Sequence, residues 1–215
     1  MKRYLFICML IAIAFGMVAG IVSCTRCGKG EPGEPNVIQD TLLVESDYDG
    51  VLPEGKLVFE HVVSTHRQQM FNLLGNGNYT WYESHAVLMR DINEAEDCTI
   101  KDITSVFSVF SEEGGSYVQY ITTNWERGTW IPEPIPGLWI EDNSLNDDAI
   151  KITLEAAFQK LMESNCTKPH DKNVTLRNPV GPKKCNAQYV FGNILETVFV
   201  DAVTGEVRTS NPAFE

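Results

Sequence analysis

The sequence has 215 residues, of which 43% are hydrophobic and 21% charged, a balance typical of a globular protein with its own core. Acidic residues outnumber basic ones by 29 to 17, which gives a net charge of −12. So acidic a surface repels phosphate backbones and anionic lipid headgroups. We therefore exclude nucleic acid as a partner and a basic patch as a means of membrane attachment.

The first 23 residues are typical of a signal peptide. Lys2 and Arg3 form a charged start, and residues 5–22 are an apolar stretch. The stretch is nearly long enough to cross a membrane, but it ends in Ile21-Val-Ser-Cys24, which resembles a lipobox. The resemblance implies cleavage before Cys24 and acylation of that cysteine, with palmitate as an expected fatty acid. We therefore predict a lipoprotein of the bacterial cell envelope, anchored in the outer membrane and facing the periplasm or the cell surface.

Cleavage at this point removes only basic charge. It leaves 15 basic residues against 29 acidic ones, a net charge of −14 for the mature chain. The acyl chains on Cys24 would then hold the protein on the bilayer.

Six cysteines are present, one of which is lost with the signal peptide and one of which is acylated. The four others, an even number in an exported chain, indicate disulfide bonding: Cys27, Cys98, Cys166 and Cys185. We predict a Cys166–Cys185 bridge, because each lies at the border of a predicted element within one domain. Free buried thiols are the alternative.

The mature chain begins with a predicted tether and continues into a first α+β module, residues 51–140. Residues 24–50 are rich in glycine, proline and acidic residues, so they predict a flexible spacer. Residues 56–63 predict a strand. A helix follows, with Thr65 and Gln68 spaced as a capping box and Gly75 as the residue after its end. Strands are then expected at residues 79–90, 103–110 and 117–123.

Residues 124–139 carry three tryptophans among alternating prolines: Trp125, Trp130, Trp139, Pro132, Pro134 and Pro136. The prolines exclude an inner strand or a helix and favour extended backbone. One interpretation is a stiff connector whose tryptophans pack on both neighbours. The other is an aromatic binding loop, because tryptophan combines a large contact area with a hydrogen-bond donor. We expect Trp139 to be packed, between Leu138 and Ile140, and Trp130 to be exposed.

Residues 141–215 form the second predicted module. Thr153 is a suitable N-cap for a helix over residues 154–164, whose apolar residues lie on one side at helical spacing: Leu154, Ala157, Phe158, Leu161 and Met162. Three strands are expected at residues 173–177, 187–191 and 197–201. The helix buries its apolar stripe on their sheet.

Residues 196–208 predict a β-hairpin. Val198, Val200 and Ala202 point to one face and Thr197, Phe199 and Asp201 to the other, the alternation of a strand with at least one buried face. Gly205 supplies the positive φ of a short turn. Asp201 lies just before the turn, where its carboxylate can accept hydrogen bonds from the turn amides. The sequence Val200-Asp-Ala-Val-Thr-Gly-Glu-Val207 resembles the closing hairpin of PepSY-like domains, small helix-plus-sheet modules of secreted and membrane-attached bacterial proteins.

The two halves share one order of predicted elements: a strand, a helix and three strands. We therefore predict an α+β fold in which a helix packs on an antiparallel sheet, arranged as two PepSY-like or cystatin-like modules in tandem. The resemblance itself covers residues 153–208, and the first half carries no family motif.

The sequence lacks the common catalytic motifs, such as H-E-x-x-H and G-x-S-x-G. His61 and His66 are a weak candidate for a shared metal site, and Cys98 could form a dyad only with a distant histidine. We therefore predict no enzyme, no catalytic residue, no metal and no cofactor.

The resulting functional prediction is a membrane-anchored binding module. The PepSY-like resemblance implies binding, and restraint, of a protease or another envelope protein, with sheet edges or loops as the contact surface. The alternative is a glycan or small ligand bound by Trp125, Trp130 and Trp139. A hydrolase without a recognisable motif is the lower alternative.

Overall fold

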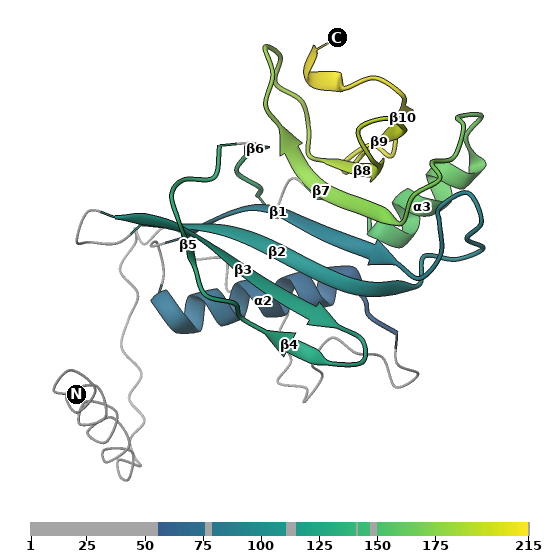
Figure 1. Ribbon diagram of the computed structural model, residues 1–215. Helices are drawn as coiled ribbons and strands as arrows, with labels where there is room; N and C mark the ends of the chain where they lie inside the picture. The colour runs from purple at the N-terminus through teal and green to yellow at the C-terminus, as the bar shows by residue number, and fades with distance from the viewer. Residues whose placement is uncertain (1–55, 76–78, 111–114, 141, 147–149, 215) are drawn as a thin grey trace, which may run out of the picture. The chain divides into compact units, whose positions relative to one another are not determined.

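The computed structural model describes residues 56–75, 79–110, 115–140, 142–146 and 150–214 (Figure 1). The signal peptide, the lipidation of Cys24, the tether and Cys27 lie outside these residues. No helix in the described ranges is both long and apolar enough to span a bilayer.

Strands dominate the described part of the chain. It contains two α-helices, α2 (Phe59–Leu74) and α3 (Leu154–Glu163), and a short 3-10 helix, η2 (Pro212–Phe214). The ten strands are β1 (Tyr79–Leu88), β2 (Ile100–Phe110), β3 (Ser116–Asn124), β4 (Gly128–Trp130), β5 (Ile135–Pro136), β6 (Asp142–Asn143), β7 (Asn173–Pro179), β8 (Gln188–Gly192), β9 (Thr197–Asp201) and β10 (Val207–Arg208).

All ten strands belong to one antiparallel sheet. Its order is β10-β9-β8-β7-β1-β2-β3-β4, with β5 paired to β3 and β6 paired to β7. Strand β7, from the second half of the chain, pairs directly with β1, from the first half, along Glu83–Val87 and Asn173–Arg177. The predicted α+β fold of two PepSY-like or cystatin-like modules in tandem is therefore wrong. The sequence shows alternation within each strand, but it does not show which distant strands become neighbours.

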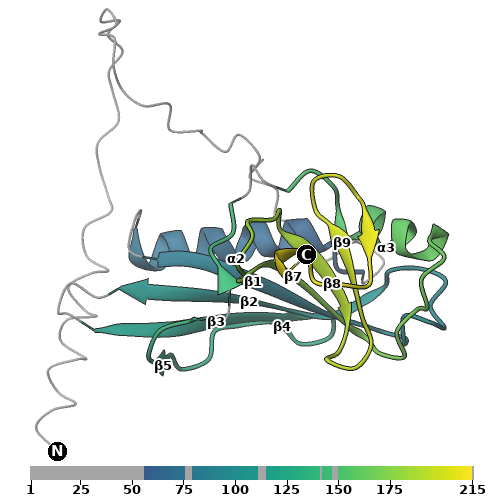
Figure 2. The ribbon, with the colours of Figure 1, turned by 90° about the horizontal axis from the view of Figure 1, so that it is seen from above.

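Strand register divides the sheet into two faces. Ser84, Ser105 and Ile121 lie opposite one another on the face that contacts α2, which we call the helix face. Helix α2 packs on β1, β2 and β3, and α3 packs on β9 (Figure 2). Residues of both helices and of the helix face form one buried cluster. The core is therefore continuous across the two halves of the chain.

Helix α2 begins earlier than expected, because residues 59–63 are helical and not a strand. Its buried residues recur at helical spacing: Phe59, Val62, Val63, His66 and Met70. This helical spacing of buried residues outweighs the strand preference of the β-branched residues in the segment. Thr65 lies inside the helix, where its Oγ1 donates to the His61 carbonyl at 3.0 Å, so the expected capping box is wrong. The expected helix end is confirmed at Gly75, whose φ is 72° and whose N–H donates to Phe71.

Helix α3 matches its prediction closely. Thr153 is the N-cap and accepts a hydrogen bond from Ala156 N at 3.1 Å. Leu154, Ala157, Phe158 and Leu161 are buried as the stripe predicted. The N-terminus of α3 receives a second acceptor from α2, because Leu154 N donates to Glu60 Oε1 at 2.6 Å. The two helices are thus joined directly at this point.

Candidate binding surface

The outer edge of β3 is covered by two short strands, and the segment that forms them contains three prolines. Strand β4 pairs with the end of β3 and β5 pairs with its start. Between them, Pro132 O accepts a hydrogen bond at 2.9 Å from the side chain of Gln119. Prolines 132, 134 and 136 have no N–H to offer a further strand, and short edge strands of this kind resist edge-to-edge pairing. A partner at this edge would therefore contact side chains and not extend the sheet.

The segment along this edge exposes most of its large apolar side chains. These are Trp125, Trp130, Ile131, Ile135, Leu138 and Ile140, which we call the edge surface. Trp130 is 43% exposed and Ile140 is 80% exposed. Trp130 is paired with Thr122 and Ile135 with Val118, so both lie on the face of the sheet opposite the helix face. Single exposed apolar residues are ordinary, but a run of them indicates an interaction site.

The three tryptophans singled out by the sequence have different surroundings. Trp125 and Trp130 are exposed, and Trp139 is half-buried. The indole Nε1 of Trp139 is enclosed without a hydrogen-bond partner among the described residues. Trp139 lies where the chain passes from β5, outside β3, to β6, beside β7. It is therefore the most enclosed of the three, although Leu138 and Ile140 on either side of it are exposed, whereas Trp125 and Trp130 are available for contact.

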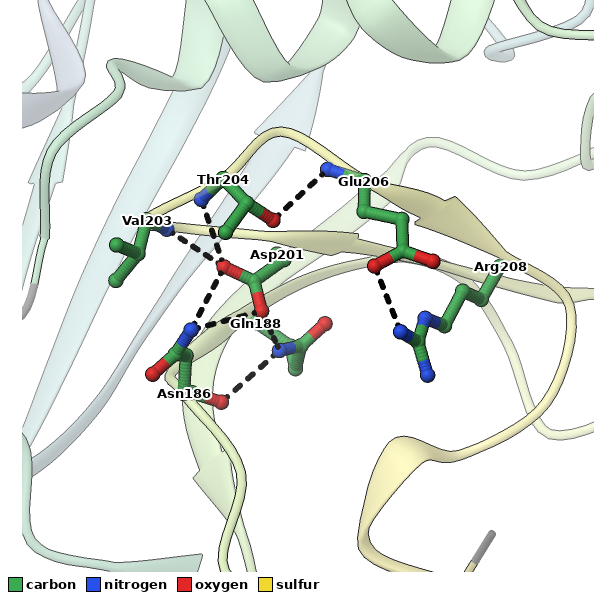
Figure 3. A network of polar contacts seen from close by, with 7 residues as sticks. All are labelled: Asn186, Gln188, Asp201, Val203, Thr204, Glu206 and Arg208. Carbon is green, nitrogen blue, oxygen red and sulfur yellow. Dashed lines mark hydrogen bonds and ion pairs between the residues drawn. The ribbon is translucent and has the colours of Figure 1, made fainter.

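The opposite edge of the sheet is the predicted β-hairpin, which is confirmed. Val207 of β10 pairs with Val200 of β9, and Gly205 has a φ of 75°. The turn between the strands is stabilised by Asp201, as Figure 3 shows. Val203 N and Thr204 N donate to Asp201 Oδ1 at 2.8 and 2.9 Å.

Asp201 also joins the hairpin to the strand beside it. Asn186 Nδ2 donates to both carboxylate oxygens, at 3.0 and 3.2 Å, and Gln188 Nε2 donates to Oδ2 at 3.3 Å (Figure 3). Burial by itself raises the pKa of Asp201, but these hydrogen bonds together outweigh it and hold the pKa below its usual value. Next to it, Arg208 is paired with Glu206 at 2.6 Å. The carboxylate is therefore used by the fold, and its predicted structural role is confirmed.

A cavity of about 380 Å³ lies against this network. Its lining residues are Lys184, Cys185, Asn186, Gln188, Asp201, Arg208 and Pro212. Two of the charged residues that line it already have partners: Asp201 is hydrogen-bonded to Asn186 and Gln188, and Arg208 is paired with Glu206. We therefore do not assign a ligand to it.

His66 is the most buried titratable group of α2. Its Nδ1 is hydrogen-bonded to Ser105 Oγ at 2.9 Å and its Nε2 to Thr123 Oγ1 at 2.8 Å. A serine beside a histidine is also an arrangement for nucleophilic catalysis. Both side chains are fully buried beneath α2, however, so a substrate could reach them only if the helix moved. The contact serves to position the helix on the sheet.

The weak metal site proposed for His61 and His66 is not formed. The two residues are five apart in one helix, about 140° around its axis, and both ring nitrogens of His66 are already hydrogen-bonded. No group of three potential metal ligands occurs among the residues that the structure describes.

The structure does not contain the expected Cys166–Cys185 bridge, because both thiols are free. Cys185 precedes the first residue of β8. Cys166 follows α3, in the segment whose Pro169 lies against Gly192 at the other end of β8. A strand of five residues spans roughly 16 Å, and a disulfide joins Cα atoms less than about 7 Å apart. The sequence shows that both cysteines lie at element borders. It does not show that these borders lie near opposite ends of β8.

Cys98 is also a free thiol, in a second cavity of about 410 Å³ between the N-termini of α2 and α3. Burial, with a smaller contribution from the nearby Glu60, raises the pKa of Cys98 to about 12. Burial also raises the pKa of Glu60, the residue that accepts from Leu154 N. The thiol therefore stays protonated near neutral pH and is a poor nucleophile. No histidine lines the described part of this cavity, so the considered dyad is not formed.

Comparison with known proteins finds no match to a family model, a curated protein or a solved structure. The resemblance of residues 200–207 to PepSY-like domains, and that of residues 21–24 to a lipobox, therefore remain predictions.

Proposed function

We propose that this chain is a non-catalytic module of the bacterial envelope that binds another protein through the edge surface. The observation that carries the proposal is the run of exposed apolar side chains between Trp125 and Ile140. Proteases are one class of partner, which the PepSY-like resemblance implies. A tryptophan with neighbouring aliphatic side chains is a common centre of protein–protein interfaces.

The chemistry of the edge surface favours a protein over a glycan. Four of its six exposed apolar side chains are aliphatic: Ile131, Ile135, Leu138 and Ile140. Glycan sites depend on flat aromatic rings and on hydrogen-bond groups arranged around them. Branched aliphatic side chains contribute contact area only, which an apolar protein surface can match.

The test uses the full lipidated chain in its native membranes. A photoreactive residue in place of Ile135 should cross-link one discrete protein, whereas the same residue in place of Leu195 should not. Leu195 is the matched control, because it is an aliphatic side chain, 89% exposed, on the β8–β9 connection. Affinity for the cross-linked protein should fall at least thirtyfold in Trp130→Ala, about 2 kcal/mol, and stay unchanged in Leu195→Ser.

Two outcomes would count against the proposal. One is equal cross-linking from positions 135 and 195, which would indicate nonspecific contact. The other is capture of a polysaccharide that soluble glycan displaces, since this would support the glycan alternative. The unfolding midpoint of Trp130→Ala should match that of the parent chain, because truncation of an exposed side chain changes stability by less than about 0.5 kcal/mol.

The envelope location rests on Cys24 and has its own test. Intact-mass analysis should find a mature chain that begins at Cys24 and carries lipid. Cys24→Ala should move the protein out of the membrane fraction, because one acyl-bearing residue supplies the attachment. Equal membrane association of the variant would contradict it.

A further inference from the structure

A continuous series of hydrogen-bonded side chains runs from β1 through α2 to the edge surface. Trp81 Nε1 donates to Ser84 Oγ at 3.1 Å, and Ser84 Oγ is hydrogen-bonded to Ser105 Oγ at 2.8 Å. His66 links Ser105 to Thr123, as described above. Thr123 Oγ1 is in turn hydrogen-bonded at 2.7 Å to Thr129 Oγ1 of β4. We call these six residues the His66 series.

The series ends beside the edge surface. Thr129 is the residue before Trp130 in β4, a strand of only three residues. Beside the backbone pairing of β4 with β3, this hydroxyl contact is the side-chain hydrogen bond that attaches β4 to the described part of the body. His66 is therefore two hydrogen bonds away from the segment that presents Trp130. The ring is connected to the proposed binding surface through Thr123 and Thr129.

The surroundings of His66 suit only a neutral ring. Its direct partners are uncharged hydroxyls. On the neighbouring strands, Glu83, His85 and Asp102 lie on the opposite face of the sheet by register. On α2 itself, Arg67 lies over the Trp81 ring at 5.3 Å, and Glu60 is hydrogen-bonded to α3.

Burial accordingly lowers the pKa of His66 to about 3. No carboxylate on these described elements contributes to that shift. A proton on the ring would place an uncompensated charge in the core.

We propose that His66 makes the edge surface sensitive to acid: protonation of its ring releases α2 and β4 together and weakens partner binding. The consequence for binding rests on the proposed function, but the structural step does not. A released ring takes up a proton below about pH 6.5, and the packed ring does not until about pH 3. Acid therefore favours release, by up to about tenfold per pH unit within that window and about thirtyfold at pH 5. The effect is about twofold at pH 6.5 and nearly absent at pH 7.5.

Hydrogen exchange of the full chain without a partner tests the structural step. Protection factors, corrected for the intrinsic pH dependence of exchange, should fall in α2 and β4 by up to about thirtyfold between pH 7.5 and pH 5. The amides of β8 and β9 are the internal control and should keep their protection.

Two variants separate His66 from other histidines. His66→Gln keeps a hydrogen-bonding side chain that does not titrate, so α2 and β4 should lose their pH response. His85→Gln is the matched control. Burial also lowers the pKa of His85, but it lies on the opposite face with Thr175, so this variant should respond to acid as the parent chain does.

The proposal is overturned if exchange of α2 and β4 is unchanged by pH, if His66→Gln keeps the full response, or if all strands lose protection equally. Should His66→Gln not fold, Thr129→Val removes only the last link. It should loosen β4 at both pH values and leave the acid response of α2 intact. If β4 is unaffected at both pH values, the proposal is also overturned.

These measurements involve no partner, so their failure leaves the proposed function standing. Failure of the cross-linking test conversely leaves the exchange result intact.

Discussion

The two outer edges of the sheet end in opposite ways. At one edge, β10 is two residues long and its turn is held by Asp201, which accepts hydrogen bonds from four residues. At the other edge, β4 and β5 are three and two residues long, but the side chains beside them are apolar and exposed. Both edges are therefore formed by very short strands. They differ in their side chains: the polar groups at the β10 edge are hydrogen-bonded, whereas the apolar side chains at the β4–β5 edge are exposed to water.

This difference changes which region deserves a functional interpretation. A cavity lined by lysine, arginine, aspartate and cysteine suggests chemistry, yet Asp201 is already hydrogen-bonded to the amides of Asn186 and Gln188, and Arg208 is paired with Glu206. The edge surface is instead defined by exposed apolar side chains. Its apolar side chains nonetheless remain in water at a cost that contact with a partner would relieve. Our functional proposal therefore rests on the exposed apolar side chains and not on reactive groups.

The largest effect that we expect in this comparison is the loss of Asp201. Asp201→Ala removes the acceptor for two turn amides and two side-chain amides and should cost about 3 kcal/mol of unfolding free energy. Asp201→Asn keeps one acceptor oxygen and should cost less. Chemical denaturation of both variants measures the difference.

A control lies in the same hairpin. Glu206→Ala removes the partner of Arg208 in an exposed ion pair, which contributes little to stability, so it should change unfolding by less than about 1 kcal/mol. If Asp201→Ala were as mild as Glu206→Ala, the network would be incidental. Its carboxylate would then be free for a functional role after all.

In the unsubstituted chain, acid should destabilise the β9–β10 hairpin, as Asp201→Ala does. The folded chain holds the pKa of Asp201 below its ordinary value, so the stability that it contributes is present at neutral pH. That contribution is lost as the pH falls through the lowered pKa.

Local patterns in the sequence predicted local structure well. The apolar stripe of α3, its N-cap Thr153, and the turn at Gly205 all appear where expected, because each depends on residues within one or two turns of the chain. The strand interpretation of residues 56–63 was wrong for the same reason. Val62 and Val63 favour strands individually, while the buried spacing that makes them helical becomes visible only over the longer segment to Met70.

Contacts between distant residues could not be predicted in this way. The pairing of β7 with β1 joins segments about 90 residues apart, and no pattern within either strand names its partner. His66 is 39 residues from Ser105 and 57 from Thr123. In the sequence, His66 is one of four scattered histidines. Its position on the apolar side of a helix is the feature that could have indicated its burial. The edge surface could be anticipated more fully, because prolines and tryptophans are concentrated in one short segment.

The last comparison concerns Trp139 and is made within residues 124–140 themselves. Trp139 is half-buried where the chain crosses from β5 to β6, so Trp139→Ala should cost about 2 kcal/mol, less than a fully buried tryptophan would. Its enclosed Nε1 has no partner among the described residues, and removal of that unsatisfied donor offsets part of the loss. Trp139→Phe keeps most of the ring area and removes the donor, so it should be nearly neutral. Thermal melts of the two Trp139 variants and of Trp130→Ala measure these differences in stability. Equal and large destabilisation by Trp130→Ala and Trp139→Ala would mean that residues 124–140 are a packed connector throughout. The edge surface would then no longer be a binding site.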